Sequence, residues 1–308
     1  MSVKNLGHSI MGTPLGIGLG ELAHAGGRIF YVDSELGDDG NTGLEPDKAK
    51  KTVNAAYVAC TTNKNDVIAL IPRATSYAIS ASESILTWSK DYVHMVGASD
   101  GRVRVDMAAG VSTAGIALSG DGCVFKNVYL TNSSNTAASG ALVLTGTNCT
   151  FVNCQIAAML GATSAADAGA YTIKFTGGGG HKFIGCTIGQ TSQARTNANS
   201  DIIPATSVDN VSFTDCKFIM NSGSAAQFFL SAGASSITGV WVFRSPIFAN
   251  VGTGLTTAFS INAAPGGYFV LDTGALSFGS TKYCASANVL IGAPVPTGLT
   301  SGLAVAAA

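Results

Sequence analysis

The sequence predicts an all-β solenoid: a parallel β-helix of about eight coils, a short N-terminal capping helix and extended terminal arms. Six segments repeat one pattern: CVFKNVYL, CTFVNCQI, HKFIGCTI, VSFTDCKF, WVFRSPIF and GYFVLDTG. Their phenylalanines are Phe125, Phe151, Phe183, Phe213, Phe243 and Phe269, at intervals of 26, 32, 30, 30 and 26 residues. Such near-even spacing is typical of stacked structural units rather than of one mixed globular core.

Aligning the segments on phenylalanine shows which positions the coil requires. Small turn-forming residues stand two positions later, where the chain has Asn127, Asn153, Gly185, Asp215 and Ser245. Cys154, Cys186 and Cys216 stand three positions later. This pattern predicts two short strands that meet at a tight bend. We expect the phenylalanines from 125 to 243 to form one inward column and the three cysteines another.

A second kind of strand precedes each repeat. GIALSG, ALVLTG and YTIKFTG alternate apolar and other residues at period two, as half-buried strands do, and FFLSAG and FSINAAPGG match more loosely. Weaker copies begin at Asp66 and Tyr92. Each coil is therefore expected to contain two or three short strands, which pair with the strands of the next coil at about 4.8 Å.

Composition narrows the possible partners. The net charge is −1, with 17 Lys and Arg against 18 Asp and Glu, and no basic stripe points to a nucleic acid. The apolar stretch 10–23 is interrupted by Gly and Pro and contains Glu21, which argues against a membrane span and a signal peptide. We expect a protein made in the cytoplasm, without a membrane partner.

The cysteines and histidines suggest a core rather than a cofactor site. No CxxC motif or histidine pair accompanies the seven cysteines, and stacked cysteines on parallel strands point the same way, which suits a disulfide poorly. We expect core thiols, a packed His181 and no cofactor. Asp33, Glu35, Asp38 and Asp39 in and before a Gly-rich loop leave calcium as an alternative to a plain turn, but Gly37 stands where a calcium loop needs an acid.

The region before the coils has its own character. Tyr31 and Val32 lie in a strand pattern, a loop rich in Gly and Asp follows, and Pro46 and Asp47 suggest the start of a helix. Apolar residues then recur at helical spacing, at Val53, Ala56, Tyr57 and Cys60. Such a helix would cover the open end of the stack.

This region and the later repeats resemble the pectate-lyase-like right-handed β-helix family. The resemblance rests on Tyr31, Val32, Gly37, Asp39, Gly43, Pro46, Thr52, Val53, Ala56 and segments such as CTFVNCQI, and it covers about residues 29–284. That family is common in phage tailspikes and other virion proteins and in polysaccharide-degrading enzymes. We expect four parts in the whole chain: an N-terminal arm (1–28), a first strand, loop and capping helix (29–65), the β-helix (66–284) and a C-terminal arm (285–308).

Enzymes of the family use paired carboxylates, or a calcium-bound acid with an Arg or Lys base. Hydrolysis needs two carboxyl groups within roughly 5 to 10 Å. Asp121 and Asp209 share a column but are separated by two intervening coils, which have Thr147 and Gly179 there, and Asp167 and Asp201 lie in loops. Trp88 and Trp241 are the only tryptophans that could provide a sugar platform, and we expect Trp241 to point inward, which leaves Trp88 as the outward candidate. We therefore assign no catalytic residues, and a polysaccharide lyase or hydrolase stays the alternative.

The termini are the strongest pointer to function. Residues 1–28 carry only Lys4, Glu21 and Arg28 as charged side chains, and residues 285–308 carry none, whereas disordered tails are normally polar. Gly12, Gly16, Gly18 and Gly20 would let the first arm follow another protein closely, and Pro294 and Pro296 would hold the second extended. We expect a non-enzymatic virion protein of a tailed phage, either a capsid decoration or cement subunit or a head-spike subunit. It would form homotrimers, contact the major capsid or another virion protein, and assemble in the host cytoplasm. The alternative is a small tailspike-like polysaccharide depolymerase.

Overall fold

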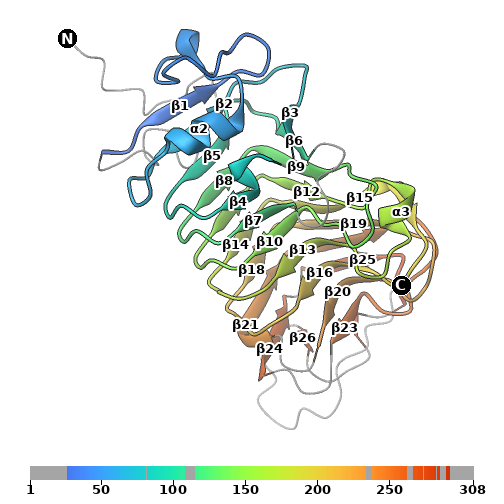
Figure 1. The fold of residues 1–308 in the computed structure, drawn as a ribbon. Helices are drawn as coiled ribbons and strands as arrows, with labels where there is room; N and C mark the ends of the chain where they lie inside the picture. Colours follow the sequence, from blue (N-terminus) through green and yellow to red (C-terminus); the bar gives the residue numbers. More distant parts are fainter. Residues whose placement is uncertain are drawn as a thin grey trace.

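The computed structural model describes residues 26–80, 82–107, 115–233, 237–261, 266–272, 274–281, 283–284 and 289–291. The chain winds into a right-handed parallel β-helix, in which three long sheets run along a rod (Figure 1). The predicted all-β parallel β-helix is confirmed. No helix in the described part of the chain is long and apolar enough to span a membrane.

Sheet A contains the strands that carry the phenylalanine repeats. Its strands pair in parallel along the rod. The short strand β17 (Val208–Asp209) lies off this main order and pairs in parallel with the first two residues of β21. In order they are β1 (Ile29–Val32), β2 (Val67–Leu70), β5 (His94–Gly97), β8 (Val124–Lys126), β11 (Thr150–Val152), β14 (Lys182–Ile184), β18 (Ser212–Thr214), β21 (Ile237–Arg244), β24 (Gly266–Leu271) and β26 (Val289–Ile291).

Sheets B and C form the other two sides of the rod. Sheet B contains β3 (Tyr77–Ile79), β6 (Val103–Met107), β9 (Val128–Asn132), β12 (Gln155–Ala157), β15 (Thr187–Arg195), β19 (Lys217–Ser222), β22 (Ile247–Asn250) and β25 (Leu276–Phe278). Sheet C contains β4 (Thr87–Trp88), β7 (Ile116–Leu118), β10 (Leu142–Leu144), β13 (Tyr171–Phe175), β16 (Ser200–Pro204), β20 (Phe228–Ala232) and β23 (Phe259–Ile261).

Each coil visits the sheets in the order A, B, C. Seven coils, from β2 to β23, have a strand in all three sheets, and partial coils extend the stack at both ends. The prediction of about eight coils therefore corresponds to seven complete coils with incomplete ends. Strands of the second kind, such as GIALSG and ALVLTG, form sheet C at β7 and β10.

The predicted phenylalanine column is present. Its five members are paired in register from coil to coil and are fully buried: Phe125, Phe151, Phe183, Phe213 and Phe243. Successive ring centroids are 5.2, 4.8, 4.8 and 4.7 Å apart, with the rings stacked. The sixth repeat was aligned wrongly, because Phe243 pairs with Leu271 and Phe269 pairs with Trp241. An aromatic residue in the neighbouring inward column caused this error.

The turn between sheets A and B explains why a small residue stands two positions after each phenylalanine. The small residues have positive φ, between 47° and 61°: Asn127, Asn153, Gly185, Asp215 and Ser245. This left-handed conformation favours Gly, Asn and Asp. The predicted cysteine column follows each turn: Cys154, Cys186 and Cys216 are fully buried, and their thiols donate to Phe125, Phe151 and Phe183 carbonyls at 3.3 to 3.4 Å. All seven cysteines are free.

The predicted capping helix is α2 (Val53–Ala59), which packs against β1 and β2. Val53, Ala56, Tyr57 and Cys60 are buried, as the helical spacing predicts. The α-helix does not start at Pro46, because η3 (Pro46–Lys48) is a separate single turn and the Thr52 hydroxyl accepts the α2 capping bond from the Ala55 N–H at 3.1 Å. The other helices within the described residues are η4 (Ser84–Leu86) and α3 (Ala162–Ala165).

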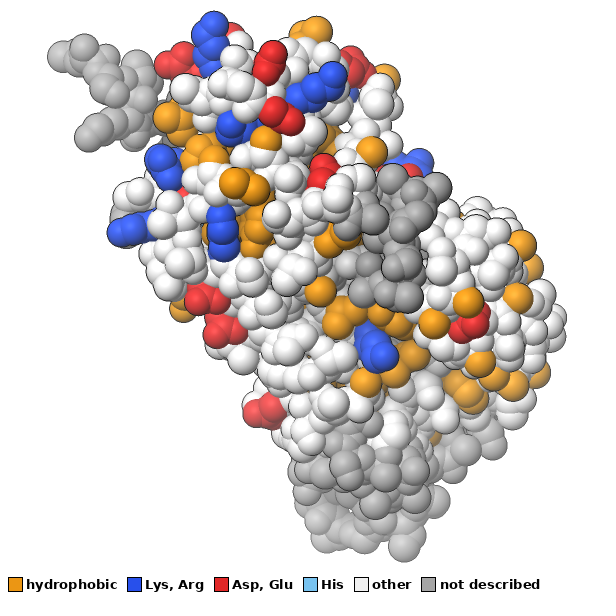
Figure 2. Space-filling view, in the orientation of Figure 1, with side chains coloured by type: hydrophobic (Ala, Val, Ile, Leu, Met, Phe, Trp, Pro, Cys, Tyr) orange, Lys and Arg blue, Asp and Glu red, His pale blue; other side chains and the backbone are white. Residues whose placement is uncertain are grey.

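The predicted arms lie largely outside the described residues. The arm residues singled out from the sequence, Gly12, Gly16, Gly18, Gly20, Pro294 and Pro296, all lie outside them. Within the range 285–308, strand β26 pairs with β24 and extends sheet A. In Figure 2, many of the charged side chains on the visible face gather at the end of the rod that carries β1 and α2.

Candidate functional site

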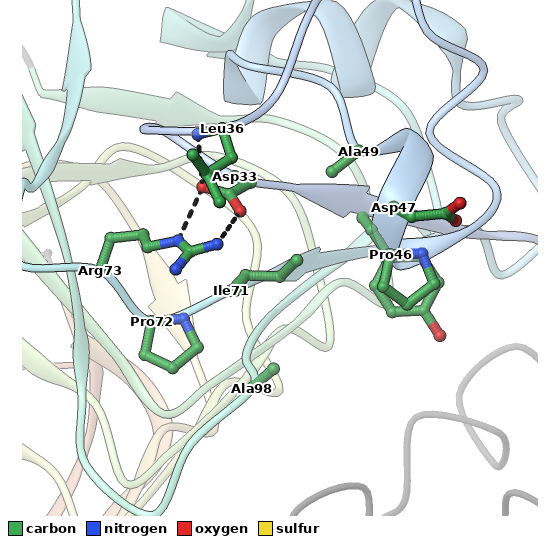
Figure 3. Close-up of a pocket in the computed structure, with 10 residues that line it drawn as sticks. Asp33, Leu36, Pro46, Asp47, Ala49, Ile71, Pro72, Arg73 and Ala98 are labelled. Carbon is green, nitrogen blue, oxygen red and sulfur yellow. Dashed lines mark hydrogen bonds and ion pairs between the residues drawn. The ribbon is translucent and has the colours of Figure 1, made fainter.

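A pocket of about 450 Å³ lies at the first end of the rod, where the loop after β1 meets the segment after β2 (Figure 3). β1, its loop and η3 provide most of one wall, and the residues that follow β2 and β5 provide the other. The lining residues are Tyr31, Asp33, Leu36, Pro46, Asp47, Ala49, Ile71, Pro72, Arg73 and Ala98. Most of these side chains are apolar, so the pocket suits an apolar group better than a charged one.

An ion pair between Asp33 and Arg73 forms part of the wall. Arg73 Nε donates to Asp33 Oδ1 at 2.8 Å and Nη2 donates to Oδ2, while the N–H groups of Glu35 and Leu36 donate to Oδ1 at 3.0 Å. The hydrogen bond from Arg73 holds the pKa of Asp33 at about 2. This carboxylate stays ionised and fully partnered at neutral pH, so it fixes the loop and is a poor acid or base.

The other polar groups of the pocket do not complete a catalytic set. The Asp47 carboxylate points away from the Asp33–Arg73 pair in Figure 3. Burial raises the pKa of Tyr31, which keeps its phenol protonated at neutral pH. The pocket can hold an apolar group, but its two acids do not face one another as hydrolysis requires.

The acids of the Gly-rich loop are used inside the loop. Asp38 Oδ1 accepts the Gly40 N–H at 2.8 Å, and Asp39 Oδ1 accepts the N–H groups of Lys51 and Thr52 at 2.9 and 2.8 Å. These hydrogen bonds hold the Gly-rich loop as a turn that leads into α2. In the described residues, no group of three or more His, Cys, Asp and Glu side chains is arranged to hold a metal ion.

Asp121 and Asp209 occupy the column that the sequence predicts. Thr147, Gly179 and Asp209 are bridged in register, and Asp121 Oδ1 accepts the Thr147 N–H at 2.6 Å. Asp91 Oδ1 likewise accepts the Asp121 N–H at 2.9 Å. Three strand spacings of about 4.8 Å separate Asp121 from Asp209, or roughly 14 Å, too far for a pair that shares one glycosidic bond. Asp91 and Asp121 instead tie adjacent coils together.

Asp201 belongs to a buried ion pair that the sequence analysis missed. Arg195 Nη2 and Thr172 Oγ1 both donate to Asp201 Oδ1, the latter at 2.6 Å, and the side chains of Arg195 and Asp201 are fully buried. Arg195 Nε and Nη1 and Asp201 Oδ2 have no protein partner among the described residues. Asp167 is partly exposed and accepts the Gly169 N–H at 2.7 Å. Asp201 is therefore closed to a polymer substrate, and no sequence motif marks the pair.

Neither tryptophan forms a sugar platform. Trp88, which the sequence analysis left as an outward candidate, is fully buried, and its Nε1 donates to the Val93 carbonyl at 3.3 Å. Trp241 is fully buried as expected, and its Nε1 donates to the Val208 carbonyl at 3.2 Å. Both indoles are parts of the core.

The two described histidines are buried with different partners. His94 Nδ1 accepts the Val124 N–H at 3.1 Å, so its proton lies on Nε2, 3.3 Å from Asn65 Oδ1. The predicted packed histidine, His181, is fully buried, and neither of its ring nitrogens has a partner among the described residues. Burial lowers the pKa of each to about 4. Both are neutral at physiological pH.

Comparisons with known proteins support the fold. No model of a protein family matches the chain, and no curated protein matches its sequence. Among solved structures, a rhamnogalacturonan lyase has a TM-score of 0.51 at 13% identity, covering 84% of this chain and 74% of that one. The pectate lyase Pel9A has a TM-score of 0.49 at 14% identity, covering 85% of this chain and 78% of that one.

A third similar structure is ORF18 of Geobacillus virus E2, with a TM-score of 0.32 at 11% identity, covering 76% of this chain and 59% of that one. At these identities the likeness concerns the fold alone. The chain therefore has a parallel β-helix fold, which it shares with the rhamnogalacturonan lyase, and its function has to be argued from its own residues.

Proposed function

We propose that this protein is a non-enzymatic structural subunit of a virion, a decoration or head-spike subunit of a tailed phage. It attaches through its N-terminal arm to the major capsid protein or another virion protein and assembles as a homotrimer in the host cytoplasm. The β-helix acts as a rigid spacer in this proposal.

One observation carries the non-enzymatic part: three of the acids that a polysaccharide-degrading site could use are already occupied. Asp33 is paired with Arg73, Asp121 accepts a backbone N–H of the next coil, and Asp201 is sealed beside Arg195. Turning any of them into a general acid or base would first require breaking these bonds. With both tryptophans in the core, the described surface also lacks the indole platforms that a sugar groove would use.

The attachment part rests on the composition of the first arm. Residues 1–28 contain three charged side chains and are rich in Gly, Leu and Ile, so water alone would solvate them poorly. The described rod, in contrast, buries its own core and pairs its own strands. The rod does not need the arm to complete its core, so we infer that the apolar arm binds the surface of another protein.

The test is a deletion of residues 2–26, assayed with virions or empty capsids of the host phage. We expect the truncated protein to keep its circular dichroism spectrum, because β1 and all later strands are intact, and to lose particle binding. A matched variant with Gly12, Gly16, Gly18 and Gly20 changed to Ala keeps the length and apolar character of the arm. It should bind more weakly, because a Cβ at these positions prevents close contact.

Full occupancy of particles by the truncated rod would overturn the attachment. The non-enzymatic part is tested separately by incubating the intact protein with capsular polysaccharide and lipopolysaccharide. Release of reducing ends or unsaturated products, lost in Asp167→Asn or Asp201→Asn, would establish the depolymerase instead.

A further inference from the structure

Six of the seven junctions between neighbouring strands of sheet A, from β1 to β21, share one backbone hydrogen bond. At each of them, a backbone N–H donates to the carbonyl of the residue just before its partner in the previous coil, as Lys182 does to Cys149 O at 3.0 Å. The N–H groups that make this bond, at 2.8 to 3.0 Å, belong to Val67, His94, Thr150, Lys182, Ser212 and Val242. The repeated bond ties each coil to the one before it.

The junction between β5 and β8, near the capped end of the rod, departs from this pattern (Figure 1). By the repeat, the Val124 N–H would donate to Val93 O. That carbonyl instead accepts Trp88 Nε1–H at 3.3 Å, and the Val124 N–H donates to His94 Nδ1 at 3.1 Å. The register of this junction contains two residue pairs, Met95 with Phe125 and Val96 with Lys126. A histidine ring therefore replaces a backbone carbonyl in the hydrogen bonding of sheet A.

The ring is held in the state that can accept this bond. His94 is 3% exposed, and its Nε2 lies 3.3 Å from Asn65 Oδ1, so the proton of the neutral ring is on Nε2. Burial lowers the pKa of His94 to about 4, and Asp66, which precedes β2, opposes this shift. The other charged groups on the neighbouring elements are Arg28, which pairs with Asp66 at 3.7 Å, and Lys126 on the outer face of β8. At neutral pH the ring is uncharged and Nδ1 is free to accept.

We propose that His94 is an acid-sensitive latch between β5 and β8. A proton on Nδ1 turns this acceptor into a donor that faces the Val124 N–H, so the hydrogen bond is lost and the start of β8 loosens from β5. Sheet B keeps the same two coils together, because β6 and β9 pair over five residues. Acid therefore opens one side of the rod locally, at the end that carries α2 and the pocket. This inference does not depend on the proposed function.

The reporter is hydrogen exchange at the backbone amide of Val124. The Lys182 and Ser212 amides are matched controls in the same chain, because they occupy the same row and donate to backbone carbonyls. Exchange is compared with that of an unstructured peptide at about pH 7 and about pH 3.5, above and below the pKa of His94. We expect the protection of Val124 to fall by up to about tenfold more than that of the controls, the ratio for loss of one net hydrogen bond.

A general loss of stability in acid changes all three amides alike, so only the difference between them reports on His94. An equal fall in the protection of Val124, Lys182 and Ser212 would overturn the proposal. At neutral pH, a scalar coupling across the hydrogen bond between the Val124 amide nitrogen and His94 Nδ1 should be observed by NMR. Its absence would remove the latch itself.

Two variants separate the acceptor from its titration. His94→Asn places Oδ1 as many bonds from the backbone as Nδ1, so it can accept the Val124 N–H but takes up no proton in this pH range. Val124 should then stay as protected as the controls at both pH values. His94→Leu removes the acceptor, and Val124 should exchange faster than the controls already at neutral pH. A selective loss of Val124 protection in acid that persists in His94→Asn would show that another group causes it, and the proposal would be wrong.

Discussion

A buried histidine without partners should make this protein sensitive to acid. His181 lies inside the rod, in the column of Cys149 and Val211, and its ring centroid is 5.6 Å from that of Phe175. It is fully buried, and neither Nδ1 nor Nε2 has a hydrogen-bond partner among the described residues. Burial lowers its pKa from 6.5 to about 4, with a smaller opposing effect from Asp121.

The sign of the pH effect follows from proton binding. Between the unfolded pKa of 6.5 and the folded value of about 4, the unfolded chain binds a proton that the folded chain does not. The stability contributed by neutral His181 is therefore fully present above pH 6.5 and is lost as the pH falls towards 4. The interval between the two pKa values corresponds to about 3 kcal/mol. His94 has the same pair of values and adds a similar loss over the same range.

The test compares His181→Leu with the unchanged protein by urea unfolding at about pH 7.5 and about pH 4.5. We expect the unchanged protein to lose several kcal/mol between these conditions and the variant to lose about 3 kcal/mol less. At neutral pH the variant should be at least as stable, because it no longer buries polar atoms without partners. Val211→Leu, in the same column, is the control and should keep the full pH dependence. The same loss of stability on acidification in His181→Leu and the unchanged protein would refute the reasoning.

Two further predictions concern the core columns. Phe183 stacks at 4.8 Å on Phe151 and on Phe213, so Phe183→Ala should cost about 3 to 5 kcal/mol in urea unfolding and Phe183→Leu clearly less; equal costs would show that the cavity contributes little. Cys284 is the only one of the seven cysteines that is not buried, so a thiol reagent should modify one cysteine rapidly in the native protein and the other six only after unfolding. Rapid labelling of several thiols would contradict the buried column.

The parts of the fold that repeat could be read from the sequence. The turn between sheets A and B is one or two residues long in the coils from β8 to β22. A short turn of fixed geometry demands the same residue types each time, so Asn127, Asn153 and Asp215 mark it at a constant distance from phenylalanine. The alignment failed at Phe269, where the aromatic residue belongs to the next inward column and pairs with Trp241. Hydrophobicity alone does not separate two inward columns two residues apart.

The candidate site residues were harder to read, because the chain departs from the repeat where they lie. The Pro46–Asp47 start signal belongs to the single turn η3, and the α2 cap comes instead from Thr52, which the loop acid Asp39 holds through its backbone N–H at 2.8 Å. Arg73 reaches Asp33 over 40 positions of sequence, and neither residue lies in a repeated column. Long-range pairs of this kind depend on where the coils place two irregular segments, which single-sequence periodicity does not encode.

The connections from sheet B to sheet C show where this fold has room for new chemistry. From β9 to β23 they vary between 4 and 13 residues, whereas the turns from sheet A to sheet B stay short. Six of the eight buried polar atoms without a protein partner in the described residues belong to side chains in or beside these connections: Ser139, Arg195, Asn199, Asp201 and Gln227. The inward columns of the three sheets must be apolar, but the B-to-C connections can contain polar side chains. Connections of unequal length can fold over such side chains, and ordered water can provide their hydrogen bonds. Asp201 is an example: it is buried beside the Arg195 guanidinium under a closed connection, whereas a longer or more open connection at the same place would expose its carboxyl group to solvent. In the described part of this chain, the buried polar groups without a protein partner therefore lie mainly at the B-to-C connections, whereas the A-to-B turns repeat one geometry.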